Sequence, residues 1–445
     1  MNFVRKRKFE KMTLILGTSS IFRRKMFREH FNDFILDDNA GFEQFISPDI
    51  DEKAIRHADP SKLCQMIAEA KCEAILKNFE ERKLPKDSII LTFDQVVVCN
   101  GQLREKPVDK DQATEFLKSY ANGQPALALS GVVAHNISNG KRAVLLDKVT
   151  VTFTDFSQEV IEHLIDVGEI FHASGSFTID DRELGKYVQD MDDTIDAIEG
   201  LPIEALKKAI YQVTSEIKFE IEKPLAMITH ALFDMDGLLL DTEVLYTIAQ
   251  QKVLDQFEIK FTPEVKAKMM GRKALEGASV MIEHYGIDMD PQKFLDDRNE
   301  ILAKLFPNCD LMPGALRLLR HFKKHNVPMA VATSSTRCHF NLKITKHKAL
   351  FDQMFDYVVT GDDVEKSKPD PEIFVKAAQK YDEDIDPSKV LVFEDAVLGV
   401  EAANAAKMNA VWVYDQQEVQ NHIKAEQKIK SLFYFKPELF HLPKF

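Results

Sequence analysis

The chain has few of the features that mark secreted, membrane or metal-finger proteins. Its 445 residues include five cysteines, and no two of them form a C-x-x-C pair. This pattern favours free thiols in a reducing compartment over a disulfide framework or a zinc site. No window approaches the roughly 18 uninterrupted apolar residues of a membrane span, and the basic start MNFVRKRKFEKM lacks the apolar stretch of a signal peptide. We therefore expect a cytoplasmic protein.

An excess of positive charge is also absent. The formal net charge is −13, with 45% hydrophobic and 29% charged residues. This composition is typical of a globular protein, and the acidic balance argues against general binding to nucleic acid polymers or anionic membranes. A small anionic substrate would need local basic side chains or a divalent cation. Small-molecule partners are therefore expected, and the sequence carries no signal of oligomeric state.

The length exceeds what one ordinary core accommodates, so at least two domains are expected. Residues 12–210 alternate strand-like and helix-like stretches, and "SIILTFDQVVVC" (88–99) is the strongest strand pattern among them. Residues 211–228 have no clear amphipathic period and contain Pro224, so we place a linker there. A second domain should cover 229–417, and 418–445 form a C-terminal tail without assignment.

The second half has the pattern of an α/β domain with a parallel sheet. "HALFDMDG", "VPMAVATSS", "KVLVFEDA" and "NAVWVYD" are short apolar runs, as in strands covered on both faces. About 80 mostly helical residues (242–322) separate the first two strands, which is far longer than a simple crossover. The sequence therefore predicts a Rossmann-like core with an inserted helical cap.

Polar side chains follow three of these strands. They are Asp234 and Asp236, Thr333 and Ser334, and Glu394 and Asp395, and Lys368 lies in a loop directly before a helix. Because ligands bind beyond the carboxyl ends of parallel strands, these groups should meet in one crevice. The sequence therefore predicts one phosphoryl-transfer site built from distant segments.

The two aspartates of the first strand suit covalent catalysis. Asp234 would attack phosphorus and form an aspartyl phosphate, and Asp236 would protonate the leaving alkoxide and later activate water. Carboxylates would repel a phosphate monoester unless a divalent cation such as Mg²⁺ lay among them. The expected metal ligands are Asp234, Asp236 and Asp395, and the expected phosphoryl-binding residues are Thr333, Ser334 and Lys368.

These motifs resemble the haloacid dehalogenase superfamily, whose first motif D-x-D-G-x-x-x-D matches Asp234 to Asp241. The resemblance covers about 229–415 and implies Mg²⁺-dependent phosphatase activity. Several segments, among them "GDDVEKSKPDPEIF" and "LVFEDAVLGVEAANAA", are similar to the pseudouridine-5'-phosphatase branch. Substrate choice would then rest on the cap near 271–273, or this loop is only a solvated basic turn. Lys407 departs from the family, because relatives carry glycine at this position.

The first half contains a second candidate anion site. In "LILGTSSIFRRK", small hydroxyl residues including Ser20 precede Arg23 and Arg24, which can donate to phosphate oxygens. Farther along, Asp94 lies within a strongly apolar strand, where a carboxylate is costly unless it is capped, paired or coordinates a metal. Lys71 and Lys106 are the further candidate ligands of an anion.

This set resembles the Maf family of nucleoside triphosphate pyrophosphatases from about Leu14 to Ile210. The resemblance implies metal-dependent cleavage to a nucleoside monophosphate and pyrophosphate, with Asp94 as proton acceptor. Phe22 and Gln95 are similar to the branch that acts on 7-methyl-GTP, since an aromatic face suits a cationic purine. Within "GSFTIDDRELG", Asp180 is the candidate for the acid that contacts the base, and the neighbouring Asp181 remains an alternative.

The sequence therefore predicts two hydrolases in one chain, a Maf-like mixed α/β domain and a haloacid dehalogenase-like phosphatase. Both would act on nucleotides and need a divalent cation. Two rival hypotheses stay open. The first half could be a nucleotide-sensing module without turnover, and the second half could act on a phosphosugar or glycerol phosphate.

Overall fold

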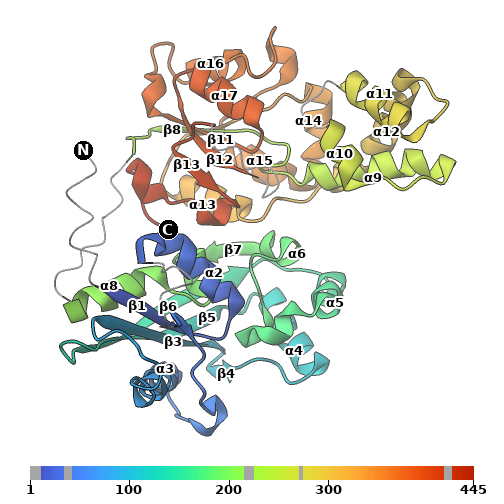
Figure 1. The fold of residues 1–445 in the computed structure, drawn as a ribbon. Helices are drawn as coiled ribbons and strands as arrows, with labels where there is room; N and C mark the ends of the chain where they lie inside the picture. The colour runs from blue at the N-terminus through green and yellow to red at the C-terminus, as the bar shows by residue number, and fades with distance from the viewer. Residues whose placement is uncertain (1–11, 35–42, 215–224, 270–273, 415–422) are drawn as a thin grey trace. The chain divides into compact units, whose positions relative to one another are not determined.

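The computed structural model describes residues 12–34, 43–214, 225–269, 274–414 and 423–445 (Figure 1). The chain divides into two compact units, Met1–Lys223 with Phe445 and Pro224–Lys444. Helix α8 (Ile203–Thr214) continues four residues past the expected end of the first domain at Ile210. Each unit is built around its own sheet.

The N-terminal unit contains a seven-stranded mixed sheet in the order β2-β1-β3-β5-β6-β7, with β4 paired to β3. Strands β2, β1 and β3 are parallel, and β3, β5, β6 and β7 form an antiparallel series. The strands are β1 (Thr13–Gly17), β2 (Phe45–Ile46), β3 (Ser88–Cys99), β4 (Gln102–Arg104), β5 (Ala126–Asn136), β6 (Arg142–Phe153) and β7 (Val188–Met191). The expected strand over 88–99 is confirmed.

Helices cover both faces of this sheet, because its strands alternate their apolar side chains. Leu14 and Leu16 face the cluster that includes helix α8, whereas Ile15 faces the cluster with Ala68 and Cys72. The helices are α2 (Ile21–His30), α3 (Pro60–Lys77), α4 (Lys110–Ala121), α5 (Gln158–Val167), α6 (Arg182–Gly185), α7 (Ile195–Ile198) and α8.

Helix α3 packs directly against the middle of the sheet. A Cβ atom at Gly131 of β5 would lie 2.5 Å from the backbone of Cys64, so only glycine allows this approach. Gly131 is paired with Asp94 of β3. The close contact between α3 and Gly131 therefore lies beside Asp94, the candidate base.

The C-terminal unit contains a six-stranded parallel sheet in the order β10-β9-β8-β11-β12-β13. The strands are β8 (His230–Phe233), β9 (Met329–Ala332), β10 (Tyr357–Val359), β11 (Val390–Glu394), β12 (Asn409–Val413) and β13 (Gln427–Ile429). The chain builds outward from β8 to β10 on one side and then from β11 to β13 on the other. The order of strands therefore reverses between β8 and β11, where parallel sheets bind ligands.

Helices lie on both faces of this sheet as well, and Leu232 and Val392 contribute to the core cluster that includes Phe374 and Val400. The helices are α9 (Thr242–Leu254), α10 (Pro263–Met269), α11 (Ala274–Tyr285), α12 (Pro291–Leu305), α13 (Ala315–Lys324), α14 (Arg337–Lys343), α15 (Lys348–Met354), α16 (Glu372–Gln379) and α17 (Val397–Ala405). The predicted α/β fold class of both halves is confirmed.

The inserted cap comprises α9 to α12, which project from one side of the core in Figure 1 and share their own apolar cluster. We expected the cap to reach about residue 322. Helix α13 belongs to the core instead, since Phe322 packs against Phe233 and Phe393 of the central strands, with ring centroids 6.2 and 5.9 Å apart. The cap is therefore shorter than expected.

The segment from 423 onward is an integral part of the C-terminal core. Strand β13 pairs with β12, and two short 3₁₀ turns follow it, η10 (Leu432–Tyr434) and η11 (Pro437–Phe440). The ring of Phe435 lies 4.9 Å from that of Phe393 and 5.5 Å from that of Phe440. The tail that had no assignment thus completes the sheet and covers its aromatic core.

All five cysteines are free thiols, and Cys338 is the exposed one among them. Within the described ranges, no helix combines the length and the apolar character that crossing a bilayer requires.

Candidate active sites

The candidate site of the C-terminal unit lies at the carboxyl ends of β8, β9 and β11. Asp234 follows β8, Thr333 follows β9, and Glu394 is the last residue of β11. The ammonium group of Lys368 joins these segments, because its Nζ donates to Asp234 Oδ1 at 2.5 Å and to Glu394 Oε1 at 2.6 Å. It also donates to the carbonyl oxygen of Ala332 at 3.2 Å. The structure therefore brings together the strand ends that the sequence predicted to meet.

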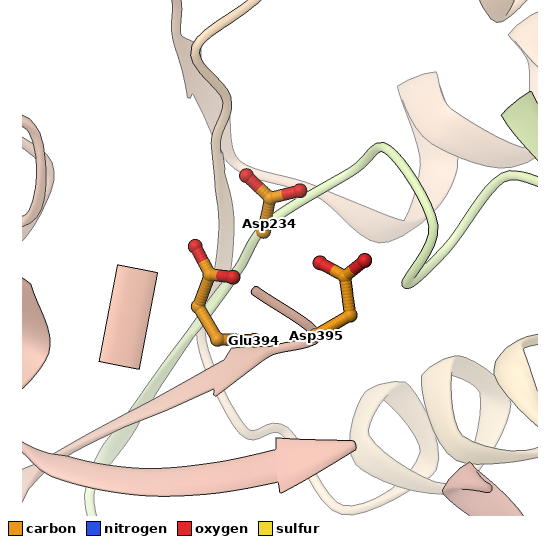
Figure 2. A group of neighbouring side chains, drawn as sticks. All are labelled: Asp234, Glu394 and Asp395. Atoms are coloured by element: carbon orange, nitrogen blue, oxygen red, sulfur yellow. The ribbon is translucent and has the colours of Figure 1, made fainter. Parts of the chain in front are cut away.

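Three carboxylates lie close together in this site (Figure 2). Oxygens of Asp234, Glu394 and Asp395 all lie within 4.8 Å of one another. Gly237, at a φ of +78°, allows this approach, since a Cβ atom there would lie 2.2 Å from Asp395 Oδ2. A cluster of carboxylate oxygens of this kind suits a hard divalent cation.

The pKa values of the charged groups in this site follow from their burial and from the closeness of like charges. Burial raises the pKa of Asp234 to about 7, with Lys368 opposing this shift and Glu394 adding to it. The pKa of Asp395 also lies well above its usual value, because of desolvation and then the repulsion from Glu394 and Asp234. The pKa of Lys368 is raised, since its two carboxylate partners outweigh its burial. A cation bound among these carboxylates would reduce the repulsion between them.

The side chain of Asp236 contacts other residues than the cluster of three carboxylates. Its Oδ1 accepts a hydrogen bond from Lys343 at 2.5 Å, and its Oδ2 accepts one from Ser335 at 2.8 Å. Thr333 Oγ1 donates to the same Oδ2 at 3.4 Å. The carboxylates that the structure groups as candidate metal ligands are therefore Asp234, Glu394 and Asp395, and the side chain of Asp236 is not among them.

Two features near Asp236 differ from the expected set. Ser334 is exposed, and the next residue, Ser335, contacts the carboxylate instead. Lys343 was not predicted, because it is one of several lysines in "LKITKHK" and its spacing carries no sign of burial. The basic cap loop at 271–273 lies outside the described residues.

The N-terminal unit has a cavity of about 1420 Å³. Most of the predicted residues of this half line it, namely Ser20, Phe22, Arg23, Lys71, Asp94, Gln95, Lys106 and Asp180. They come from α2, α3, β3 and the loops beyond β4 and before α6. The volume lies above the usual range for small-molecule pockets, so it leaves room for a nucleotide with its phosphates.

Asp94 lines this cavity and is paired with Lys71. Lys71 Nζ donates to Asp94 Oδ1 at 2.8 Å and also lies 2.8 Å from Glu52 Oε1. Burial raises the pKa of Asp94 and Lys71 opposes this shift, while Arg23 lowers it less. A buried carboxyl with a raised pKa is a stronger base than an exposed one, as a proton acceptor requires.

The two arginines at the start of α2 have different environments. The guanidinium of Arg23 lines the cavity and lies 4.9 Å from the centre of the Phe93 ring. The Nε and Nη2 atoms of Arg24 donate to the carbonyl oxygen of Thr18 at 3.3 and 3.0 Å, and its guanidinium faces the Phe45 ring. Arg24 is therefore turned to its own loop, and the prediction that it faces the anion site is not supported by this geometry.

The acidic residues before β7 also separate into distinct environments. Asp181 caps helix α6 by accepting from the backbone N–H groups of Glu183 and Leu184 at 2.8 and 2.9 Å. Glu183 is paired with Lys186 at 2.7 Å. Asp180 lines the cavity, and burial raises its pKa. Of the two acids left open by the sequence, Asp180 is the one in the cavity wall.

Comparison with known proteins identifies both units. The family model for Maf-like proteins matches residues 13–213, and the model for haloacid dehalogenase-like hydrolases matches residues 231–413. The Dictyostelium discoideum protein named 7-methyl-GTP pyrophosphatase is 39% identical over 203 residues, covering 45% of this chain and 97% of that protein.

Relatives of the second unit carry two kinds of name. (DL)-glycerol-3-phosphatase 2 of Arabidopsis thaliana is 47% identical over 224 residues, covering 49% of this chain and 93% of that protein. A Drosophila melanogaster protein named probable pseudouridine-5'-phosphatase is 42% identical over 229 residues, covering 50% of this chain and 98% of that protein. The chain thus belongs to two families, the Maf-like proteins through its N-terminal unit and the haloacid dehalogenase-like hydrolases through its C-terminal unit.

Proposed function

We propose that the chain is a bifunctional hydrolase of small phosphorylated compounds. The N-terminal unit would cleave a nucleoside triphosphate to its monophosphate and pyrophosphate, and the C-terminal unit would cleave a phosphate monoester. The observation that carries the second activity is the cluster of three carboxylates, two of them paired with Lys368, where the strand order reverses. The pair of Asp94 and Lys71 in the cavity wall carries the first.

In the phosphatase unit, an oxygen of Asp234 attacks phosphorus while the bond between phosphorus and the ester oxygen breaks. Asp236 gives its proton to the departing oxygen, so that an alcohol leaves and an aspartyl phosphate remains. Asp236 then takes a proton from water, which attacks phosphorus and releases phosphate from Asp234. Lys368 offsets negative charge throughout, because it contacts both Asp234 and Glu394.

The three clustered carboxylates, Asp234, Glu394 and Asp395, are the residues that would hold a divalent cation, and we propose Mg²⁺. When bound, this cation offsets the repulsion between the three carboxylates and the substrate phosphate. The geometry fits this role, since Lys368 pairs with only two of the three clustered carboxylates, Asp234 and Glu394.

Two substrates of the phosphatase unit have support from relatives. Pseudouridine 5'-phosphate is the substrate implied by the motifs and by the name of the Drosophila relative. Glycerol 3-phosphate is the second candidate, since the Arabidopsis glycerol-3-phosphatase 2 is more similar to this chain. Both compounds are phosphate esters of a primary alcohol, so both have a poor leaving group that needs a proton.

In the pyrophosphatase unit, Asp94 would accept a proton from the water that attacks the α-phosphorus. The bond to the bridging oxygen breaks and pyrophosphate leaves. Arg23, Lys71 and Lys106 line the cavity and can offset the phosphate charges. Phe22 and Asp180 also line the cavity, and an aromatic face together with a carboxylate suits a cationic purine such as that of 7-methyl-GTP.

The experiment that tests this proposal is a Mg²⁺-dependent screen of the full chain that measures phosphate and pyrophosphate separately. Pyrophosphate should be released from 7-methyl-GTP, and phosphate from pseudouridine 5'-phosphate or glycerol 3-phosphate. Calorimetric binding of 7-methyl-GTP without release of pyrophosphate would instead support a nucleotide-sensing role for the first unit. A chain that releases neither product from these compounds contradicts the proposal.

A further inference from the structure

Lys343 is a buried lysine that the mechanism above does not use. It is the last residue of α14, and its side chain is 1% exposed. Its Nζ donates to Asp236 Oδ1 at 2.5 Å, to Ser335 Oγ at 2.8 Å and to the Tyr246 hydroxyl at 3.4 Å. Lysine is seldom fully buried, because its charge loses hydration that its partners must replace. The partners of this lysine therefore indicate what it contributes.

The contacts of Lys343 form a closed arrangement around one carboxylate. Lys343 holds Asp236 Oδ1 and also donates to Ser335, and Ser335 in turn donates to Asp236 Oδ2 at 2.8 Å. Both oxygens of Asp236 thus have donors, so rotation of the carboxylate about its Cβ–Cγ bond would break at least one hydrogen bond. The pair of Lys343 and Ser335 fixes the plane of the Asp236 side chain.

The other side of the ammonium group lies against aromatic rings. The centroid of the Phe306 ring is 4.7 Å from Nζ, and that of the Tyr246 ring is 5.5 Å away. Tyr246 belongs to the first helix of the cap, and Phe306 directly follows its last helix (Figure 1). Aromatic faces attract a cation without competing for its hydrogen bonds. Lys343 is thereby held where the chain enters and leaves the cap.

We propose that Lys343 is a positioning residue for ester cleavage, which acts by fixing the orientation of Asp236 for proton transfer. The inference rests on the proposed phosphatase function of this unit. Asp236 must pass its proton to the leaving oxygen along a defined direction, and proton transfer is efficient only within hydrogen-bond reach. An alkoxide leaving group needs this proton, whereas p-nitrophenolate leaves as a stable anion. The effect of Lys343 should therefore depend on the leaving group.

The test compares Lys343→Met with the wild-type full chain on two kinds of ester in the presence of Mg²⁺. With pseudouridine 5'-phosphate or glycerol 3-phosphate, whichever the wild type hydrolyses, kcat/KM should fall roughly 100-fold, the scale of general acid catalysis. With p-nitrophenyl phosphate it should fall by less than about threefold, since that ester needs little acid catalysis. Lys348→Met is the matched control, because this nearby lysine is 66% exposed, and it should leave both rates unchanged.

Equal losses on both esters, or no loss on either, would overturn the role of Lys343. A wild-type chain that hydrolyses none of these esters would instead contradict the phosphatase function itself. Ser335→Ala removes the hydrogen bond to the other oxygen of Asp236 and should give the same preference for the better leaving group. If Lys343→Met does not fold, the result with Ser335→Ala tests the positioning of Asp236 in its place. In an Asp236→Asn background, Lys343→Met should cause no further loss on the alkyl ester, because the two residues act as one unit.

Discussion

Replacement of Asp395 by asparagine should stabilise the metal-free C-terminal unit. The carboxylates of Asp234, Glu394 and Asp395 lie within 4.8 Å of one another, and Lys368 contributes one positive charge, so three negative charges and one positive charge leave a local charge of −2. At 4.8 Å and an effective dielectric constant of about 20, each carboxylate pair costs about 3.5 kcal/mol. Protonation relieves part of this cost, since the pKa of Asp395 is raised.

Because protonation limits the repulsion energy between the carboxylates, we expect Asp395→Asn to raise the free energy of unfolding by about 1–3 kcal/mol near neutral pH. A unit of this size should then melt roughly 2–12 °C higher. The direction in which stability changes with pH follows from the raised pKa of Asp395. A carboxyl with a folded-state pKa above its unfolded value makes the folded state bind more protons, so the metal-free wild type should lose stability as pH rises through that range. Asp395→Asn should lose less stability over the same pH range.

The chain carries its own probe for this measurement. Its one tryptophan, Trp412, is buried in β12, and its indole Nε1 donates to the backbone carbonyl oxygen of Asp395 at 2.9 Å. Tryptophan fluorescence during thermal unfolding therefore reports the C-terminal unit in the intact chain. The substitution changes the side chain and leaves this backbone acceptor in place.

Magnesium provides the second arm of the experiment. At about 100 times its dissociation constant, Mg²⁺ should stabilise the wild type by about 2.7 kcal/mol. Asp395→Asn should lose most of this stabilisation, whereas the exposed control Asp384→Asn should melt like the wild type with and without Mg²⁺. A lower melting temperature of metal-free Asp395→Asn, or an unchanged response to Mg²⁺, would refute the reasoning.

Three further predictions concern single substitutions. Asp234→Asn should abolish phosphate release and spare pyrophosphate release, and Asp94→Asn should do the converse; loss of both products in either variant would contradict two separate sites. Asp180→Asn should lower the preference for 7-methyl-GTP over GTP about 10-fold or more, the worth of one charged hydrogen bond. Asp181→Ala should leave that preference unchanged and should lower the free energy of unfolding by about 1 kcal/mol, because a helix cap is lost. If competitive kinetics instead show that Asp181→Ala lowers the preference and Asp180→Asn does not, Asp181 contacts the base. Lys407 has a φ of +59°, a left-handed conformation that strains a residue with a side chain. Lys407→Gly should therefore raise the free energy of unfolding by about 1 kcal/mol in the same fluorescence assay. A lower melting temperature of this variant would contradict backbone strain at Lys407.

The sequence predicted the architecture well where a general rule governs it. Parallel strands bring their carboxyl ends to one edge, so the meeting of Asp234, Thr333, Lys368 and the Glu394–Asp395 pair was predictable from their places in the chain. The same holds for Asp94, since a carboxylate within an apolar strand needs a partner, and Lys71 provides it. These predictions depended on strand ends and on burial, which apolar runs reveal.

Directions of individual side chains were less predictable. Both serines after β9 have the same chemistry, and only the turn that follows the strand decides that Ser335 faces Asp236 while Ser334 faces solvent. Likewise, Arg23 and Arg24 are adjacent on α2, and helical rotation points only the first into the cavity. The sequence does not predict the burial of Lys343, because no neighbouring residue in the sequence distinguishes a buried lysine from a solvated one.

The short strand at the end of the chain limits how the phosphatase half can be produced alone. The family match stops at residue 413, whereas β13 and the rings of Phe435 and Phe440 continue the structure well beyond it. A recombinant fragment trimmed to the family match would leave β12 with an open hydrogen-bonding edge and bare aromatic surface, a combination that promotes aggregation. Fragments that retain residues up to Leu442 should remain in solution.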